Sequence, residues 1–139
     1  MKKWDYIIAI ICLSVVSIFC VFFVLSRTND EFNAVEVRYH NEVIANVDVN
    51  VDATYKIECI DNKLSLYRED VLIKQIDVDD KNFFNTFKIT DKKVEMIDAS
   101  CSGKDCEKMY ITSKHMLPII CTNGVSINPV GKTEIDDLV

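Results

Sequence analysis

The chain divides into two parts that differ in their pattern of hydrophobic and polar positions. Residues 7–25 form an unbroken apolar run whose only polar groups are the hydroxyls of Ser14 and Ser17. A helix that rises 1.5 Å per residue needs about 20 residues to cross a hydrocarbon core of ~30 Å. From about residue 34 onward, apolar and polar residues alternate with a period of two, which is typical of strands with one buried face.

The apolar run predicts a single transmembrane helix over residues 7–25. Two lysines precede it and one arginine follows closely, so the positive-inside bias places residues 1–6 in the cytoplasm and the rest outside the cell membrane. A cleaved signal peptide is the alternative, but its apolar stretch is about 7–15 residues long and ends in a small-x-small site. This run ends Phe22-Phe23-Val24-Leu25. We therefore expect an uncleaved single-pass anchor that contacts the lipid bilayer.

The alternating part predicts one small all-β domain over residues 34–131, between a polar spacer at 26–33 and a flexible tail at 132–139. Strands that recur every 8–12 residues indicate an antiparallel β-sandwich or barrel. The alternating apolar positions are Val35, Val37, Tyr39, Val43, Ala45, Val47, Val49, Val51, Tyr55, Ile57, Cys59, Leu64, Leu66, Ile73, Ile76, Val78, Phe87, Ile89, Val94 and Met96, and Asp98 follows out of register. Polar residues that tolerate left-handed backbone predict turns at Asp61-Asn62-Lys63, Glu69-Asp70 and Asp91-Lys92-Lys93.

The charge of the chain argues against one class of partner. There are 22 acidic and 16 basic residues, the net charge is −6, and no basic cluster occurs. Such a surface is a poor match for nucleic acid, which binds mainly through Lys and Arg.

The acidic run Asp77–Asn82 lacks the glycine and glutamate spacing of an EF-hand, so we expect it to be a solvated turn.

Four cysteines, Cys59, Cys101, Cys106 and Cys121, lie after the apolar run. Outside the cytoplasm the redox conditions permit disulfides, and the count is even, so a structural disulfide is the first hypothesis. Pairing Cys101 with Cys106 closes the shortest loop and leaves Cys59 with Cys121. Four cysteines allow three pairings, another of them joins Cys106 to Cys121, and sequence spacing does not choose among them.

Two alternative hypotheses use the same cysteines. Cys101, Cys106, His115 and Cys121 offer three sulfurs and one nitrogen, a ligand set that zinc accepts, although the spacing fits no standard finger. Thiol redox chemistry is the other alternative, but acidic residues flank Cys106 and offset the neighbouring lysines. No Ser-His-Asp arrangement, phosphate loop or haem motif is recognisable. We therefore expect no enzyme activity and no cofactor, with a metal ion or flavin as the alternative.

The segment from residue 85 to residue 127 has a distinctive layout. Paired strands at 85–96 lead to Cys101 and Cys106, and an apolar pair then precedes Cys121 and a final strand. In this layout the chain resembles the NusG domain II-like family of small, membrane-anchored bacterial proteins. It departs from the family pattern at turn residues, which are Ser102, Met109, Tyr110, Thr122, Asn123 and Gly124.

The resemblance implies an all-β domain that follows a membrane anchor. It does not imply transcription, because an extracytoplasmic domain does not meet RNA polymerase. Members of the family are associated with membrane electron-transfer and flavin-related systems. We therefore expect a non-enzymatic accessory or interaction module that binds another membrane protein. A redox or metal-binding electron-transfer accessory that uses the block of Cys101, Cys106 and Cys121 is the alternative.

Overall fold

The computed structural model describes residues 3–27 and 32–131. The chain separates into two compact units, Met1–Asp30 and Glu31–Val139, and each is described by itself. The tail predicted at 132–139 and the part of the predicted spacer at 28–31 lie outside the described residues.

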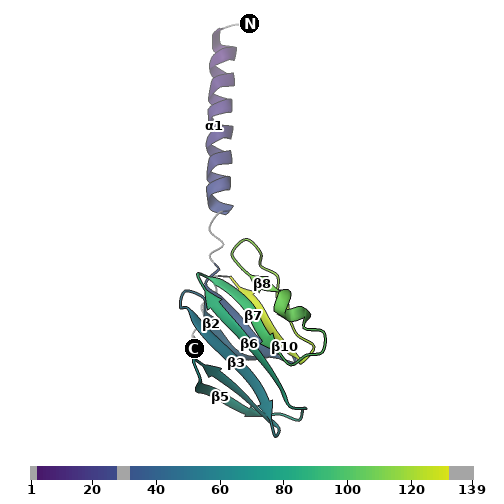
Figure 1. Cartoon of the computed structure of the whole chain (residues 1–139). Helices are drawn as coiled ribbons and strands as arrows, with labels where there is room; N and C mark the ends of the chain where they lie inside the picture. The colour runs from purple at the N-terminus through teal and green to yellow at the C-terminus, as the bar shows by residue number, and fades with distance from the viewer. Residues whose placement is uncertain (1–2, 28–31, 132–139) are drawn as a thin grey trace. The chain divides into compact units, whose positions relative to one another are not determined.

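The first unit contains one helix, α1, which spans Lys3–Arg27 (Figure 1). Its stretch Lys3–Leu25 is long and apolar enough to cross a membrane, and none of that stretch is buried within the chain. The hydroxyl of Ser14 donates to the Ile11 carbonyl at 2.8 Å, so the helix itself satisfies this polar group. The predicted apolar helix is therefore confirmed. A signal sequence near an amino terminus can also form a helix of this kind, and the helix alone is weak evidence for a membrane anchor.

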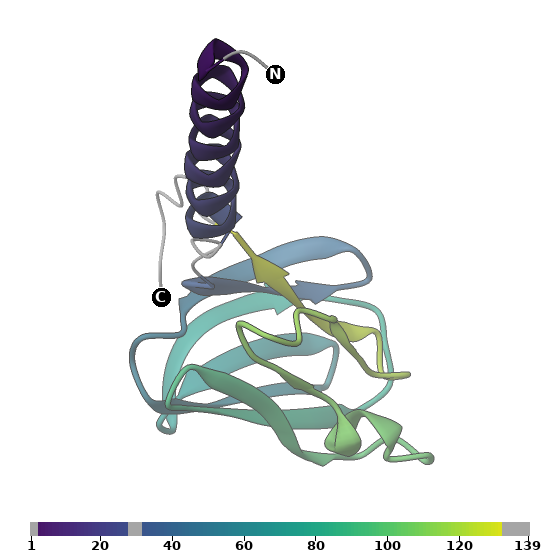
Figure 2. The same ribbon diagram turned by 90° about the horizontal axis from the view of Figure 1, so that it is seen from above.

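The second unit, the β unit, is built from two antiparallel sheets with strand orders β2-β1-β10-β9 and β5-β4-β3-β6-β7-β8. In Figure 2 the blue β1 and β2 and the yellow β10 form one layer, and the teal and green strands form the other. The strands are β1 Ala34–Tyr39, β2 Glu42–Asp48, β3 Ala53–Ile60, β4 Lys63–Arg68, β5 Val71–Asp77, β6 Phe83–Thr90, β7 Lys93–Ala99, β8 Tyr110–Ile111, β9 Ile119–Ile120 and β10 Val125–Val130. The predicted antiparallel all-β class is confirmed, and the described strands form two separate sheets rather than one closed barrel.

One hydrophobic core is shared by both sheets. The alternating residues of β1, β3 and β6 point into it, as the period of two predicts. At its centre the Tyr55 and Phe87 rings stack with centroids 5.0 Å apart, and both side chains are almost fully buried. Burying an apolar side chain of this size stabilises the fold by about 2–3 kcal/mol.

Two of the three register shifts between described strands move residues away from the predicted alternation. A shift between β1 and β2 leaves Val43 exposed and buries Ile44 instead, and Val51 lies exposed after β2. The prediction that Val43 and Val51 belong to the core is therefore wrong. A second shift between β6 and β7 exposes Asp98 and buries Ala99. A bulge inserts one extra residue into a strand, and the local pattern of apolar positions does not predict where it occurs.

The hairpin turns are built from pairs of residues with left-handed backbone. The three predicted turns are confirmed, and a fourth, unpredicted pair joins β1 to β2. Two-residue hairpin loops need positive φ at both positions to match the twist of the strands. The pairs are His40 and Asn41, Asp61 and Asn62, Glu69 and Asp70, and Asp91 and Lys92, with φ between 45° and 69°.

Candidate functional site

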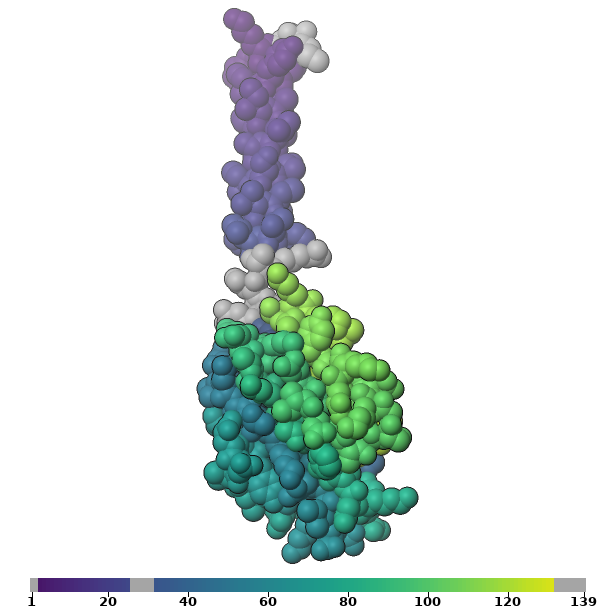
Figure 3. Space-filling model, viewed as in Figure 1, coloured from purple at the N-terminus to yellow at the C-terminus, as the bar shows by residue number. Residues whose placement is uncertain are grey.

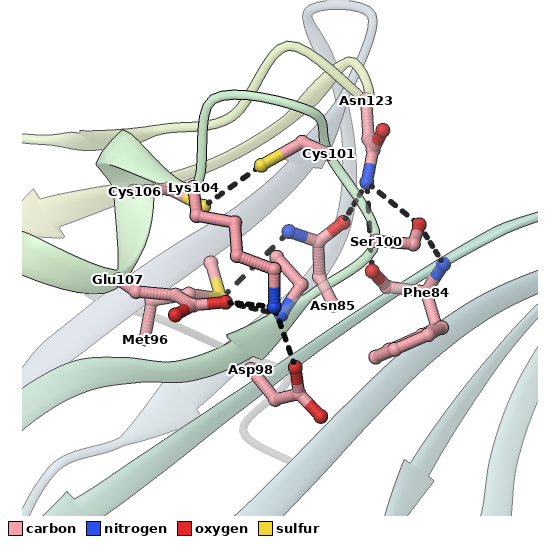
Figure 4. Close-up of polar contacts among 11 residues, drawn as sticks. Phe84, Asn85, Met96, Asp98, Ser100, Cys101, Lys104, Cys106, Glu107 and Asn123 are labelled. Carbon is pink, nitrogen blue, oxygen red and sulfur yellow. Dashed lines mark hydrogen bonds and ion pairs between the residues drawn. The ribbon is translucent and has the colours of Figure 1, made fainter.

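Three of the predicted cysteines come together inside the β unit. The sulfur atoms of Cys101, Cys106 and Cys121 all lie within 4.8 Å of one another, and all three residues are buried. We call this group the three-thiol cluster. The Sγ atoms of Cys101 and Cys106 are 3.6 Å apart (Figure 4), well beyond the roughly 2.05 Å of a disulfide bond. The structure therefore holds the three residues as free thiols.

Cys101 and Cys106 are positioned by the loop that follows β7. A short 3₁₀ helix, η1, spans Asp105–Lys108 and carries Cys106. The Glu107 carboxylate accepts the Ala99 backbone N–H at 3.1 Å and pairs with the Lys104 ammonium at 3.2 Å (Figure 4). These contacts hold η1 against the end of β7 and so fix Cys106 beside Cys101. In Figure 3 the light green atoms of this segment form a continuous area on the surface of the β unit.

Cys121 is positioned by the tight turn between β9 and β10. Its backbone N–H donates to the Val125 carbonyl at 2.9 Å, and the Gly124 N–H donates to the Cys121 carbonyl at 3.1 Å. Gly124 has a φ of 85°, and a Cβ there would lie 2.7 Å from Cε1 of His40. Glycine is therefore favoured at this position by the backbone conformation, whereas the exposed imidazole of His40 could turn aside from a Cβ.

A polar network ties the two sheets together beside the cluster. Asn123, in the β9–β10 turn, donates from Nδ2 to Oδ1 of Asn85 at 3.0 Å and to Oγ of Ser100 at 3.3 Å (Figure 4). Asn85 is fully buried on β6, and its Nδ2 lies 3.8 Å from Sδ of Met96. Buried amides that are paired in this way fix a unique geometry, because each lost partner is costly.

The pKa values of two thiols in the cluster, Cys121 and Cys106, are shifted in opposite directions. Burial raises the pKa of the Cys121 thiol, but hydrogen bonds from the Asn123 backbone N–H, the Asn85 amide and the neighbouring thiols outweigh it and bring the pKa below its ordinary value. Burial, together with the hydrogen bonds to Cys121 and Cys101, raises the pKa of Cys106. The charged residues that flank Cys106 in the sequence do not reveal these effects, because Asn85, Asn123 and Cys121 are distant from Cys106 along the chain.

Two predicted site residues lie outside the three-thiol cluster. Cys59 is buried on β3 with its Sγ 3.9 Å from the Asp80 carbonyl, and burial raises the pKa of its thiol. His115 is exposed in the β8–β9 loop, where its ring lies 5.0 Å from that of Tyr110. The predicted ligand set that includes His115 is therefore not assembled among the described residues, because the loop holds its imidazole at the surface.

A second polar group, missed by the sequence argument, surrounds Asp80. The Tyr39 hydroxyl donates to Oδ2 of Asp80 at 2.5 Å, and Nε2 of His40 lies 3.2 Å from the same oxygen. The Tyr39 and His40 hydrogen bonds lower the pKa of Asp80 to about 2. Burial and the contact with Asp80 raise the pKa of Tyr39. The sequence predicts a solvated turn at Asp80, whereas in the structure its carboxylate holds the β1–β2 turn through Tyr39 and His40. No sequence motif marks the pairing of Asp80 with these two residues.

A surface hollow reaches the three-thiol cluster. It has a volume of about 540 Å³, and Cys121 lies in its wall together with Arg38, His40, Gly124 and Ser126. A second hollow of about 400 Å³ is also lined by His40, together with Asp80, Ser100 and Asn123, among others. Of the three cysteines, Cys121 contributes to the wall of the larger of these two hollows.

Comparisons with known proteins identify the family of the chain. A search of curated proteins and a search of solved structures each find no match. The family model described as NusG domain II matches residues 6–132, a range that includes most of α1 as well as the β unit. The resemblance in the cysteine block is thus part of a similarity over most of the sequence, and the chain belongs to the NusG domain II family.

Proposed function

We propose that this chain is a non-enzymatic accessory of a bacterial membrane system, anchored by α1, with its amino terminus in the cytoplasm and its β unit outside. The observation that carries the proposal is the exposure of α1. Every large apolar side chain from Ile7 to Leu25 is at least half exposed, so residues 3–27 and 32–131 provide little cover for this helix. A bilayer would cover these side chains, and the lysines before the helix favour a cytoplasmic amino terminus.

Two measurements test the anchor. The intact mass of the membrane-bound protein separates an anchor from a signal sequence, because cleavage removes the amino-terminal residues. Labelling with a membrane-impermeant maleimide on intact cells then tests orientation, with cysteine introduced at Lys3 or at the exposed Lys88 of β6. We expect the full mass and labelling only through Lys88→Cys. A mature chain that lacks α1, or labelling through Lys3→Cys alone, would contradict the proposal.

The proposed partner is another membrane protein, and the exposed apolar side chains of the β unit support a binding role. Such side chains are exposed by 38–61% around the β7–β9 region, and they are Ile97, Met109, Tyr110, Leu117 and Ile120. A photo-crosslinking residue at Leu117 or Tyr110 in living cells tests this role, with Lys88 as an exposed polar control. We expect one discrete adduct from the apolar positions only. Equal adducts from Lys88, or none from either apolar position, would argue against a specific partner.

A second candidate function is a redox or metal-binding electron-transfer accessory that uses Cys101, Cys106 and Cys121. One observation favours it, which is the convergence of three buried sulfurs within 4.8 Å. Alkylation of the native and then the denatured full chain, followed by peptide mass analysis, reports the state of each thiol. A disulfide within the cluster would favour thiol redox chemistry, whereas free thiols that a bound metal protects from alkylation would favour metal binding. Free thiols that react alike with and without added metal would contradict this candidate.

A further inference from the structure

We propose that Cys101, Cys106 and Cys121 form a binding site for one Cu(I) ion, held by three thiolate sulfurs without a fourth protein ligand. This inference deepens the second candidate function and rests on it. It does not depend on the anchor or on the membrane partner, so the experiments on those properties can fail independently.

The sulfur positions already match the geometry of a three-coordinate metal. Metal–thiolate bonds are about 2.3 Å long, so three sulfurs around one ion in a plane lie about 4.0 Å apart. The Cys101 and Cys106 sulfurs are 3.6 Å apart, and none of the three sulfur pairs exceeds 4.8 Å. Shifts of a few tenths of an ångström, within reach of χ1 rotation, therefore bring the cluster to binding geometry.

The number and type of ligands favour Cu(I) over zinc. Structural zinc sites are almost always closed by four protein ligands, whereas Cu(I) is a soft ion that binds thiolates and is stable with three ligands. Among the described residues, no further cysteine, histidine or carboxylate joins the group. Only 2–7% of the surface of each cysteine is exposed, so protein groups surround most of each side chain.

The surroundings of the cluster supply the two further requirements of a metal site. The Asn123 backbone N–H and the Asn85 amide are hydrogen-bond donors to the Cys121 sulfur, and such donors stabilise the negative charge of a metal-bound thiolate. The hollow lined by Arg38, His40 and Cys121 gives an ion a route from solvent to the buried sulfurs. Binding displaces thiol protons and transfers no electron, so copper must arrive already reduced.

The site also lies where the two sheets meet. Cys101 follows β7 of the six-stranded sheet, and Cys121 connects β9 to β10 of the four-stranded sheet. An ion bound to both cysteines joins the sheets across the core. Because a ligand that binds only the folded state stabilises it, Cu(I) should raise the temperature at which the β unit unfolds.

The test is a Cu(I) titration of the full chain, reduced and in detergent under oxygen-free conditions, against a chromophoric Cu(I) chelator. We expect one Cu(I) per chain and a higher unfolding temperature. Each of Cys101→Ser, Cys106→Ser and Cys121→Ser should weaken the affinity by about 100-fold or more, since even groups that only orient ligands contribute 10–100-fold. Cys59→Ser is the matched control, a buried thiol outside the cluster, and it should leave the affinity unchanged.

Three results would overturn the inference. The first is no Cu(I) uptake by the fully reduced wild-type chain, and the second is an affinity that Cys121→Ser leaves unchanged. The third is an equal loss in Cys59→Ser, which would place the ligands elsewhere. Circular dichroism of each variant before titration shows whether it is folded. If a serine variant unfolds, the alanine variant at the same position is titrated instead. A second measurement tests whether bound Cu(I) protects the wild-type thiols from an alkylating reagent.

Discussion

Replacing Asn85 with aspartate tests the buried polar network that holds the three-thiol cluster. Aspartate has almost the same shape and keeps the Oδ1 acceptor for the Asn123 amide, but it replaces the Nδ2 donor with a carboxyl oxygen. The Asn85 side chain is fully buried, and its Nδ2 lies 3.8 Å from Sδ of Met96. A carboxylate buried there beside the Cys121 sulfur has no cationic partner, so it takes up a proton instead of remaining charged.

The cost of Asn85→Asp follows from two steps. The protonated carboxyl has one O–H donor where the amide has two N–H donors, and losing the second buried donor costs about 1–3 kcal/mol. Keeping a carboxyl with an ordinary pKa of about 3.9 protonated at pH 7 costs about 1.4 kcal/mol per unit, or about 4 kcal/mol in all. The free energy of unfolding should therefore fall by about 5–7 kcal/mol at pH 7, which is comparable to the whole stability of a marginal domain.

The loss should also depend on pH in a defined direction. The folded state raises the pKa of the introduced carboxyl, so the protonation part of the destabilisation is absent below the unfolded pKa and grows as the pH rises toward the folded pKa, while the cost of the lost donor remains at every pH. Acidifying from pH 7 to pH 5 should therefore return about 2.7 kcal/mol to the variant relative to the wild type. Urea unfolding of the full chain in detergent, followed by the β signal in circular dichroism at several pH values, measures both effects.

A matched control separates burial from the chemical change itself. Asn82→Asp makes the same substitution at an exposed site, where Oδ1 accepts the Asp61 N–H and aspartate can do the same. We expect this control to change stability by less than about 0.5 kcal/mol, as for most surface substitutions. A loss below about 1 kcal/mol in Asn85→Asp, with no dependence on pH, would refute the reasoning about the buried network.

Three further predictions concern the fold. Lys92→Gly should stabilise the β unit by about 0.5–1 kcal/mol in urea unfolding, because Lys92 has a φ of 60° and left-handed backbone costs a non-glycine residue about 1–2 kcal/mol; a lower stability would contradict the turn assignment. Phe87→Ala should destabilise it by about 3–5 kcal/mol in the same assay, because the ring is buried against Tyr55; a loss below about 1 kcal/mol would place Phe87 outside the core. Asp80 has its pKa lowered to about 2, so it contributes stability above about pH 4 that is lost as the pH falls through its folded value. Tyr39→Phe removes the largest cause of that shift, and acid unfolding should become less steep between about pH 4 and pH 2; an unchanged acid transition would show that this hydrogen bond does not set the pKa.

The strands could be predicted because their cause is local. In β3 the residues Tyr55, Ile57 and Cys59 alternate with polar residues, and this alternation alone determines which face is buried. The turns at Asp61-Asn62 and Asp91-Lys92 were predictable for the same reason, since polar residues interrupt the apolar pattern there. The bulge beside Val43 was not, because it depends on the register with a neighbouring strand.

The site could be predicted only in part because its geometry is not local. The spacing of Cys101 and Cys106 predicts their proximity, but Cys121 reaches them through the pairing of β9 with β10 in the other sheet. His115 is closer in sequence to Cys121 than Cys101 and Cys106 are, but it does not join the three cysteines, because the β8–β9 loop holds it at the surface. No periodicity marks Asn85 as different from the other inward-facing residues of β6, so its role in the network became visible only in the folded chain.

X-ray absorption at the copper edge of the Cu(I)-loaded full chain tests the central claim about the three-thiol cluster most directly. We predict a single shell of three sulfur ligands at about 2.3 Å, with no nitrogen or oxygen ligand. The shell should fall to two sulfurs in Cys121→Ser and stay at three in Cys59→Ser. A nitrogen or oxygen ligand, or two sulfurs in the wild type, would contradict the assignment of Cys101, Cys106 and Cys121 as one binding site.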